Sequence, residues 1–275
     1  MNKKLKTLFG VLLLTVIFCG CGTTKENTEI EEKGQSQGAV YQIGDIVNMG
    51  TYEQDNDMEN GTEPIEWLIL DIEEDKALLL SKYILCSEQY DYSSNSGGSW
   101  ERSTIYSWLN NDFMNDAFTE EEKNHILFTK ENDSELNVGY VFFLSFDEAV
   151  EYFHMSAITE TNVMTKKTYD CYYSQDALAI PTAYAMEDYL DADEMTQDTY
   201  NDLAEKSIVY DEAIIGNTYA RYWLRSKAGG FNDTAHIITE EGSLDDLGGL
   251  KNTLTKADIG VRPAMWVDLT ILESR

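Results

Sequence analysis

Histidine, cysteine and basic residues are scarce in this chain of 275 residues, and each shortage argues against a class of function. The three histidines, His125, His154 and His236, lie far apart and lack the short spacing typical of zinc ligands. The four cysteines include no Cys-x-x-Cys pair, so the common redox and metal motifs are missing. Neither a Ser-x-x-Lys nucleophile motif nor a Gly-rich phosphate loop occurs. We therefore expect no catalytic residues and no cofactor-binding motif.

Positive charge is the next shortage: 20 Lys and Arg stand against 50 Asp and Glu, which gives a net charge of −30. A field of that sign repels nucleic acid and anionic lipid headgroups, so we expect no nucleic-acid partner. The chain is nevertheless not a disordered acidic polymer. With 43% hydrophobic and 12% aromatic residues, it can bury a substantial core.

Residues 1–20 have the pattern of a lipoprotein signal peptide. Lys3, Lys4 and Lys6 precede an apolar run, Leu8 to Phe18, that is too short to span a bilayer. Gly20 stands directly before Cys21, which resembles the lipobox of bacterial lipoproteins and predicts lipidation of Cys21. An ordinary cleaved signal peptide and a single-pass N-terminal anchor are the alternatives. All three place the domain outside the cytoplasm, and lipidation would hold it at the bacterial cell membrane.

Residues 21–40 are polar and without periodicity, which predicts a flexible acidic tether. Residues 41–272 then form the folded domain, with no internal repeat or composition break that would demand a second one. This domain contains Cys86 and Cys171. Export permits a disulfide between them, but two reduced thiols are an equally good interpretation.

Strands, then helices, then strands follow one another along this domain, and that order predicts a single α+β domain with mainly antiparallel strands. Continuous apolar runs predict a hairpin of strands covered on both faces, and the Asn-Asn-Asp at 110–112 predicts an interruption in the first helical region. Thr119 and Ser145 predict helix starts, the second with a capping box through Glu148. The predicted elements are strands at 43–52, 66–72, 77–85 and 141–144, and helices after 103, after 119, at 145–153 and from 180 to about 205.

The last third of the chain contains two segments with period-two alternation, Tyr222 to Arg225 and Ile259 to Leu269. Each places one Trp and one Arg on a common face. An arginine inside a strand needs a carboxylate or several carbonyls, so one interpretation is an internal Arg–Asp/Glu network. The other is a ligand surface built with the neighbouring Gly-rich loops. The candidate ligand-binding residues are Trp223, Arg225, Phe231, Asn232, Asp233, Arg262 and Trp266.

Several local patterns, in order along the chain, resemble the bacterial family called domain of unknown function 6273. They are Gly44-Asp45-Ile46-Val47 leading to Tyr52, Pro64 to Asp71, Ala77 to Tyr83, Trp108-Leu109-Asn110 with Phe113, Phe143-Leu144-Ser145 with Asp147-Glu148-Ala149, Pro181 to Ala185, Trp223 to Ser226 and Val261 to Val267. The family's layout is similar to the C-type-lectin-like fold of formylglycine-generating enzymes, so the resemblance implies that fold here. Those enzymes use a reactive cysteine pair near the C-terminus. This chain has no cysteine after Cys171, so their activity is not implied.

The expected function is that of a lipid-anchored binding protein that recognises a protein or a glycan outside the cell. An extracytoplasmic enzyme acting on cell-envelope material and a structural subunit of an envelope complex are the alternatives. The ion to consider is calcium. Asp55, Asp57, Glu59 and Glu66 have the spacing of an EF-hand loop, although the glycine falls one position late and strands flank the segment.

Overall fold

The computed structural model describes residues 41–92, 97, 99–131, 137–161, 166, 168–189, 219–228, 234–245, 251–253 and 259–273. These residues combine mainly antiparallel sheets with short helices, which confirms the predicted α+β class. The signal peptide, Cys21 and the tether lie outside the described residues, as do three of the candidate ligand residues, Phe231, Asn232 and Asp233.

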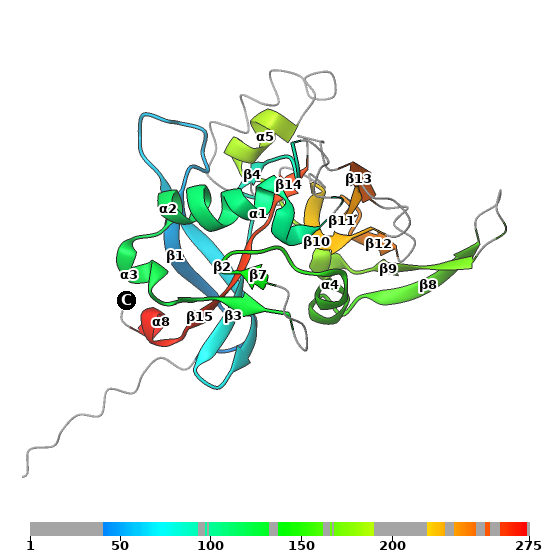
Figure 1. Cartoon of the computed structure of the whole chain (residues 1–275), viewed down its shortest axis with the longest axis horizontal. Coiled ribbons are helices and arrows are strands. Elements are labelled where there is room, and N and C mark those ends of the chain that lie inside the picture. The colour runs from blue at the N-terminus through cyan, green and yellow to red at the C-terminus, as the bar shows by residue number, and fades with distance from the viewer. Residues whose placement is uncertain are drawn as a thin grey trace, which may run out of the picture. The chain divides into compact units, whose positions relative to one another are not determined.

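The first sheet contains the predicted hairpin. Its strand order is β1-β2-β3-β15-β5 and every pairing is antiparallel (Figure 1). Leu78, Leu79 and Leu80 of β3 are at most 2% exposed, so both faces of that strand are covered, as their unbroken apolar run predicts. The strands are β1 (Ile46–Tyr52), β2 (Glu63–Glu73), β3 (Lys76–Ser81), β15 (Ala264–Asp268) and β5 (Ile126–Leu127).

The second sheet has the order β13-β11-β10-β14-β4, with β10 and β14 running parallel. A third sheet, β12-β9-β8, includes the long β8–β9 hairpin (Figure 1). β6 and β7 form a small two-stranded sheet. The bounds are β4 (Cys86–Ser87), β6 (Thr129–Lys130), β7 (Asn137–Gly139), β8 (Ser156–Thr161), β9 (Thr168–Tyr173), β10 (Tyr222–Lys227), β11 (Thr234–Ile238), β12 (Ser243–Asp245), β13 (Lys251–Thr253) and β14 (Gly260–Val261).

The prediction of one continuous strand from Ile259 to Leu269 is wrong. Arg262 and Pro263 separate β14, in the second sheet, from β15, in the first. Proline has no N–H to give to a strand ladder, so a break at Pro263 is expected on physical grounds. The chain changes sheets at this corner, which is why Arg262 is buried between them.

The helices are short. Thr119 and Ser145 both form complete capping boxes, so those two predicted starts are confirmed. The described helices are η1 (Trp100–Arg102), α1 (Thr104–Trp108), η2 (Leu109–Phe113), α2 (Met114–Ala117), α3 (Glu120–Lys123), α4 (Phe146–Tyr152), η3 (Gln175–Ala177), α5 (Ala183–Tyr189) and α8 (Thr270–Glu273). Within this described part, no helix is both long enough and apolar enough to cross a bilayer.

Two further expectations about local structure are corrected. Asn110 does not interrupt the helix, because the chain passes through it as the π-helical segment η2. Its side chain donates to the carbonyls of Tyr106 and Val141 and accepts from the N–H groups of Tyr140 and Val141, so it holds a neighbouring loop. The expected strand at 141–144 is reduced to a single bridge between Phe142 and Ala264.

Cys86 and Cys171 do not form a disulfide in this structure. Cys86 pairs with Val261 in the second sheet, whereas Cys171 pairs with Ile158 in the third. Of the two interpretations that the sequence left open, the structure therefore favours the reduced pair.

Candidate functional site

A cleft of ≈ 490 Å³ runs along α4 and reaches the first sheet at β3 and β15. A neighbouring cleft of ≈ 350 Å³ shares Glu131, Val138 and Arg225 with it. Arg225 thus lies where the two clefts meet. The described residues that line the larger one are Glu73, Lys76, Leu127, Phe128, Thr129, Lys130, Glu131, Val138, Ser145, Asp147, Glu148, Glu151, Tyr152, Arg225 and Trp266.

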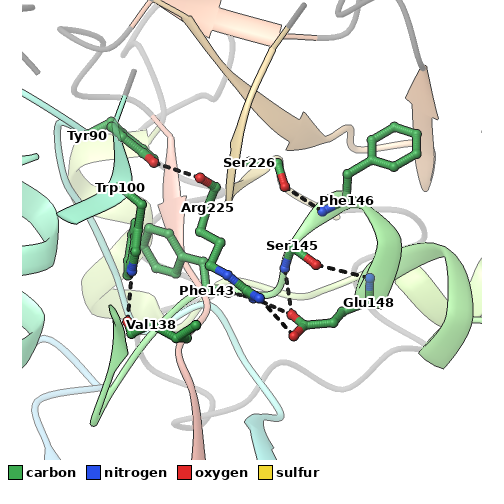
Figure 2. A network of polar contacts seen from close by, with 9 residues as sticks. All are labelled: Tyr90, Trp100, Val138, Phe143, Ser145, Phe146, Glu148, Arg225 and Ser226. Carbon is green, nitrogen blue, oxygen red and sulfur yellow. Dashed lines mark hydrogen bonds and ion pairs between the residues drawn. The ribbon is translucent and has the colours of Figure 1, made fainter. Parts of the chain in front are cut away.

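The Arg225 guanidinium forms an ion pair with Glu148 at the floor of this cleft (Figure 2). Its Nη1 donates to Oε2 of Glu148 and to the carbonyl of Phe143, the latter at 3.0 Å, and its Nη2 donates to Oε1 at 2.8 Å. Arg225 is only 7% exposed, so the carboxylate compensates a charge that would be costly to bury alone. This is the internal ion pair expected of an arginine inside a strand.

Glu148 also completes the capping box of α4. Ser145 Oγ accepts from the N–H of Glu148 at 3.1 Å, and the N–H of Ser145 donates to Oε2 at 2.7 Å. A single carboxylate therefore fixes both the start of α4 and the side chain of Arg225. Both of its oxygens are engaged, which makes Glu148 a positioning group and a poor general acid or base.

Backbone contacts join α4 and β10 around this ion pair. The N–H of Arg225 donates to the carbonyl of Leu144 at 3.0 Å, and the N–H of Phe146 donates to Ser226 Oγ at 2.8 Å. From the other side, the Tyr90 hydroxyl donates to the carbonyl of Arg225 at 2.9 Å (Figure 2). The floor of the cleft is therefore held in a single arrangement before any ligand arrives.

Trp266 lines the far end of the cleft. It faces Leu78 of β3 and Leu127 of β5 in the strand ladders, and the Nζ of Lys76 lies 4.6 Å from the centroid of its ring. Nearby, the Tyr152 hydroxyl of α4 donates to Asp71 at 3.3 Å. Burial, followed by the charge of Asp71, raises the pKa of Tyr152, so it remains a neutral donor.

The four predicted ligand residues that the structure describes do not lie together on one surface. Arg225 and Trp266 both line the cleft, at its floor and its far end. Trp223 has no exposed surface, and its indole N–H donates to the carbonyl of Glu88, so it is a core residue. Arg262 is 4% exposed and bonds internally to Ser81 and Tyr222.

Sequence reasoning missed the acidic side of the cleft, which α4 supplies through Asp147, Glu148 and Glu151. The available signal was the capping box, which located the helix start. It singled out Glu148 as a capping residue, but with 50 carboxylates in the chain nothing in the sequence indicated that the acids of this helix line a cleft. Only the fold brings α4 opposite Trp266.

A different acidic group is the place where described residues could hold a metal ion. Carboxylate oxygens of Glu53, Asp55 and Glu63 lie within 4.8 Å of one another. This is not the EF-hand spacing proposed from the sequence, since Glu66 is paired with Lys82 at 3.1 Å. Burial and the charge of Glu63 raise the pKa of Glu53. Backbone and amide N–H groups donate to all three carboxylates and offset part of their mutual repulsion.

Comparison with protein families matches residues 74–269 to DUF6273, a domain of unknown function. The resemblance predicted from the sequence begins earlier, at Gly44, so its first segments fall outside the match. No curated protein and no solved structure matches the chain. Because the matched residues make up well over half of the 275, the chain belongs to the DUF6273 family.

Proposed function

We propose that this chain is a lipid-anchored binding protein whose domain lies outside the cytoplasm and takes a segment of a protein or glycan partner in the cleft along α4. The observation that carries the proposal is the combination of a fixed floor, Arg225 with Glu148, and an aromatic far end, Trp266, in one cleft of ≈ 490 Å³. Pre-organised clefts lined by aromatic and polar groups are typical of binding sites.

The chemistry of the floor favours binding over catalysis. A general acid–base pair needs carboxylates that are free to exchange protons with a substrate. Both oxygens of Glu148 instead accept hydrogen bonds, from the Arg225 guanidinium and from the backbone N–H of Ser145 at the helix cap. The exposed aromatic pair Phe128 and Tyr140, with ring centroids 5.1 Å apart, extends the apolar surface at the rim. Such rings stack on sugars and on peptide side chains alike.

The proposed location of the protein is argued from the pattern of residues 1–21. A positive segment, a short apolar run and a small residue before Cys21 together support export and lipid attachment. The acidic tether, 21–40, suits a domain held away from an anionic membrane surface, since like charges repel.

A C-type-lectin-like relationship is part of the same proposal. Its support is the closing Gly260-Val261-Arg262 element, which lies where the chain passes between the two five-stranded sheets. A crystal structure of the domain that superposes on no lectin-like domain through β10, β14 and β15 would remove this part and leave the binding proposal intact.

Site-specific photo-crosslinking in cells tests the binding function. A photoreactive amino acid replaces Phe128, which lines the cleft and is 43% exposed. In the matched control it replaces Met58, which is 68% exposed and is not among the cleft residues. We expect a discrete adduct from position 128 alone, and mass spectrometry will identify it as polypeptide or glycan. Equal labelling from both positions, or none from 128, would contradict a partner in this cleft.

Membrane fractionation tests the anchor. Replacing Cys21 with Ser should prevent lipidation and move the protein from the membrane to the soluble fraction, whereas Cys19→Ser should leave it membrane-bound. A Cys21→Ser protein that stays with the membrane would refute lipidation at this residue.

A further inference from the structure

At the Trp266 end of the cleft, the ammonium group of Lys76 lies over the indole ring. Lys76 Nζ lies 4.6 Å from the centroid of the Trp266 ring and 2.8 Å from Glu73 Oε2. Strand geometry explains the contact: Trp266 pairs with Leu78, so Lys76, two residues earlier on β3, is its diagonal neighbour on the same face. A π-face with a carboxylate beside it is the environment that binds a lysine head group.

This internal contact is exchangeable. The side chains of Lys76 and Glu73 are 38% and 54% exposed, and ion pairs at such positions add little stability. An incoming ammonium can therefore take the place of Lys76 over the indole ring without breaking a buried network. Lys76 itself, on a long flexible stem, can move into water at small cost.

The remaining charges of the cleft also favour a cation. Its described lining contains five carboxylates, of Glu73, Glu131, Asp147, Glu148 and Glu151, and three cations, of Lys76, Lys130 and Arg225, for a net of 3 − 5 = −2. Two of the pairs are internal, Arg225 with Glu148 and Lys76 with Glu73. That leaves three carboxylates and one lysine facing a ligand.

We propose that the Trp266 end of the cleft is a subsite for the ammonium group of a lysine side chain in a protein partner, and that Lys76 occupies this subsite until the partner displaces it. The inference rests on the proposed binding function and names its ligand. A lysine stem matches the apolar lining from Leu127, Phe128 and Val138, and the ≈ 490 Å³ of the cleft accommodates more than one side chain. The net charge of the whole chain, −30, attracts such a partner from a distance.

Fluorine NMR of the full chain, labelled with 5-fluorotryptophan and kept in detergent micelles, tests the proposal. The chain has five tryptophans, and the variant Trp266→Leu identifies the Trp266 resonance by its loss. The probe is Nα-acetyl-lysine amide, titrated into the wild type and into Lys76→Met, with Lys76→Gln as a second variant. Nα-acetyl-norleucine amide has the same stem without the charge, and the arginine and glutamate amides complete the series.

We expect the lysine amide to shift the Trp266 resonance saturably. In Lys76→Met its affinity should be about two- to five-fold higher than in the wild type, the gain expected from removing a competing cation–π partner at a partly exposed site. The matched control is Lys82→Met. Lys82 also lies over an aromatic ring, that of Tyr83 at 4.9 Å, and pairs with a glutamate, but it is not among the cleft residues. It should leave the affinity unchanged.

The proposal is overturned if neither Lys76 variant gives a saturable Trp266 shift with the lysine amide, or if the norleucine or glutamate amide shifts it equally. A stronger response to the arginine amide would overturn the assignment to lysine. Crosslinking from position 128 is independent of these titrations. A partner captured there without any ammonium response at Trp266 would leave the binding function standing and refute only this subsite.

Discussion

Replacing Glu148 with Gln is the most informative perturbation, because it alters one charge and keeps the shape. Glutamine is accepted at the same position of a capping box, so the start of α4 should survive. What changes is the partner of Arg225. Its guanidinium now meets one neutral oxygen in place of two charged ones, while its own exposure stays near 7%.

The expected cost follows from that geometry. Removing one partner of a fully buried ion pair costs about 3–5 kcal/mol, since the other charge remains uncompensated. Hydrogen bonds to charged groups contribute about 1.5–3 kcal/mol. The Glu148 side chain is 31% exposed, so water compensates part of the loss and the lower range applies. We expect Glu148→Gln to lower the free energy of unfolding by about 2–3 kcal/mol, and the Tm by about 4–12 °C for a domain of this size.

Chemical denaturation and calorimetry measure this loss. Glu151→Gln removes the same charge from an exposed position on the same helix, and it should change the free energy of unfolding by less than about 0.5 kcal/mol. A double-mutant cycle with Arg225→Met isolates the pair, and the coupling should be about 1–3 kcal/mol. If Glu148→Gln is as stable as Glu151→Gln, the ion pair does not hold the floor of the cleft and the argument from pre-organisation fails.

Three further substitutions test other parts of the fold. Arg262→Met should cost about 2–4 kcal/mol in unfolding experiments, because two buried hydrogen bonds from the guanidinium are lost, and a result below about 1 kcal/mol would contradict a structural role. Gly50→Ala should cost about 2–4 kcal/mol, since Gly50 has φ +70° and an added Cβ would lie 2.7 Å from the carbonyl oxygen of Ala117. Gly61 has φ +102° but open space around it, so Gly61→Ala should cost about 1 kcal/mol. Equal losses of stability in the two variants would refute the steric argument. Glu53→Gln should stabilise the protein at pH 7. The pKa of Glu53 is raised in the folded state, so its stabilising contribution is present below the unfolded-state pKa and is lost as the pH rises through the folded-state pKa. The stability gained by Glu53→Gln should therefore vanish under acid conditions. A gain in stability that does not depend on pH would exclude the ionisation of Glu53 as its cause.

Local signals in the sequence predicted local structure well. The capping boxes at Thr119 and Ser145 depend on residues three apart, so they can be recognised without knowing the fold. The buried hairpin was predictable for a similar reason, since the unbroken leucines of β3 require cover on both faces. The corner at Pro263 was harder to foresee. Alternation continues through it in the sequence, and this outweighed the signal of Pro263 itself, which lacks the N–H of a ladder residue. The pairing of β14 and β15 with different sheets shows that the strand has ended.

The site was less predictable than the fold. Arg225 and Trp266, two of the candidate ligand residues, both line the cleft, and each was selected because it stands in a strand pattern where its residue type is unusual. Trp223 was not distinguishable from Trp266 by pattern, although its ring is entirely buried. Glu148 was recognised only as a capping residue, and Asp147 and Glu151 were not recognised as cleft residues, since acidic side chains on the exposed side of a short helix are common.

Arg225 and Arg262 are both buried in or beside strands, and their charges are compensated by different kinds of partner. Within the described part of the chain, Arg262 forms no ion pair with a carboxylate. It donates to the Ser81 carbonyl and to the Tyr222 hydroxyl, and its guanidinium carbon lies 5.6 Å from the Phe153 ring centroid. These groups belong to the junction of the two sheets, so any change there disturbs the core. Arg225 is instead neutralised by a carboxylate on α4, at the floor of the cleft. The other acids on that helix, Asp147 and Glu151, take no part in the pair. Substitutions at them can therefore alter what the cleft binds while the sheets beneath it stay intact, and a fold with that property can serve many ligands.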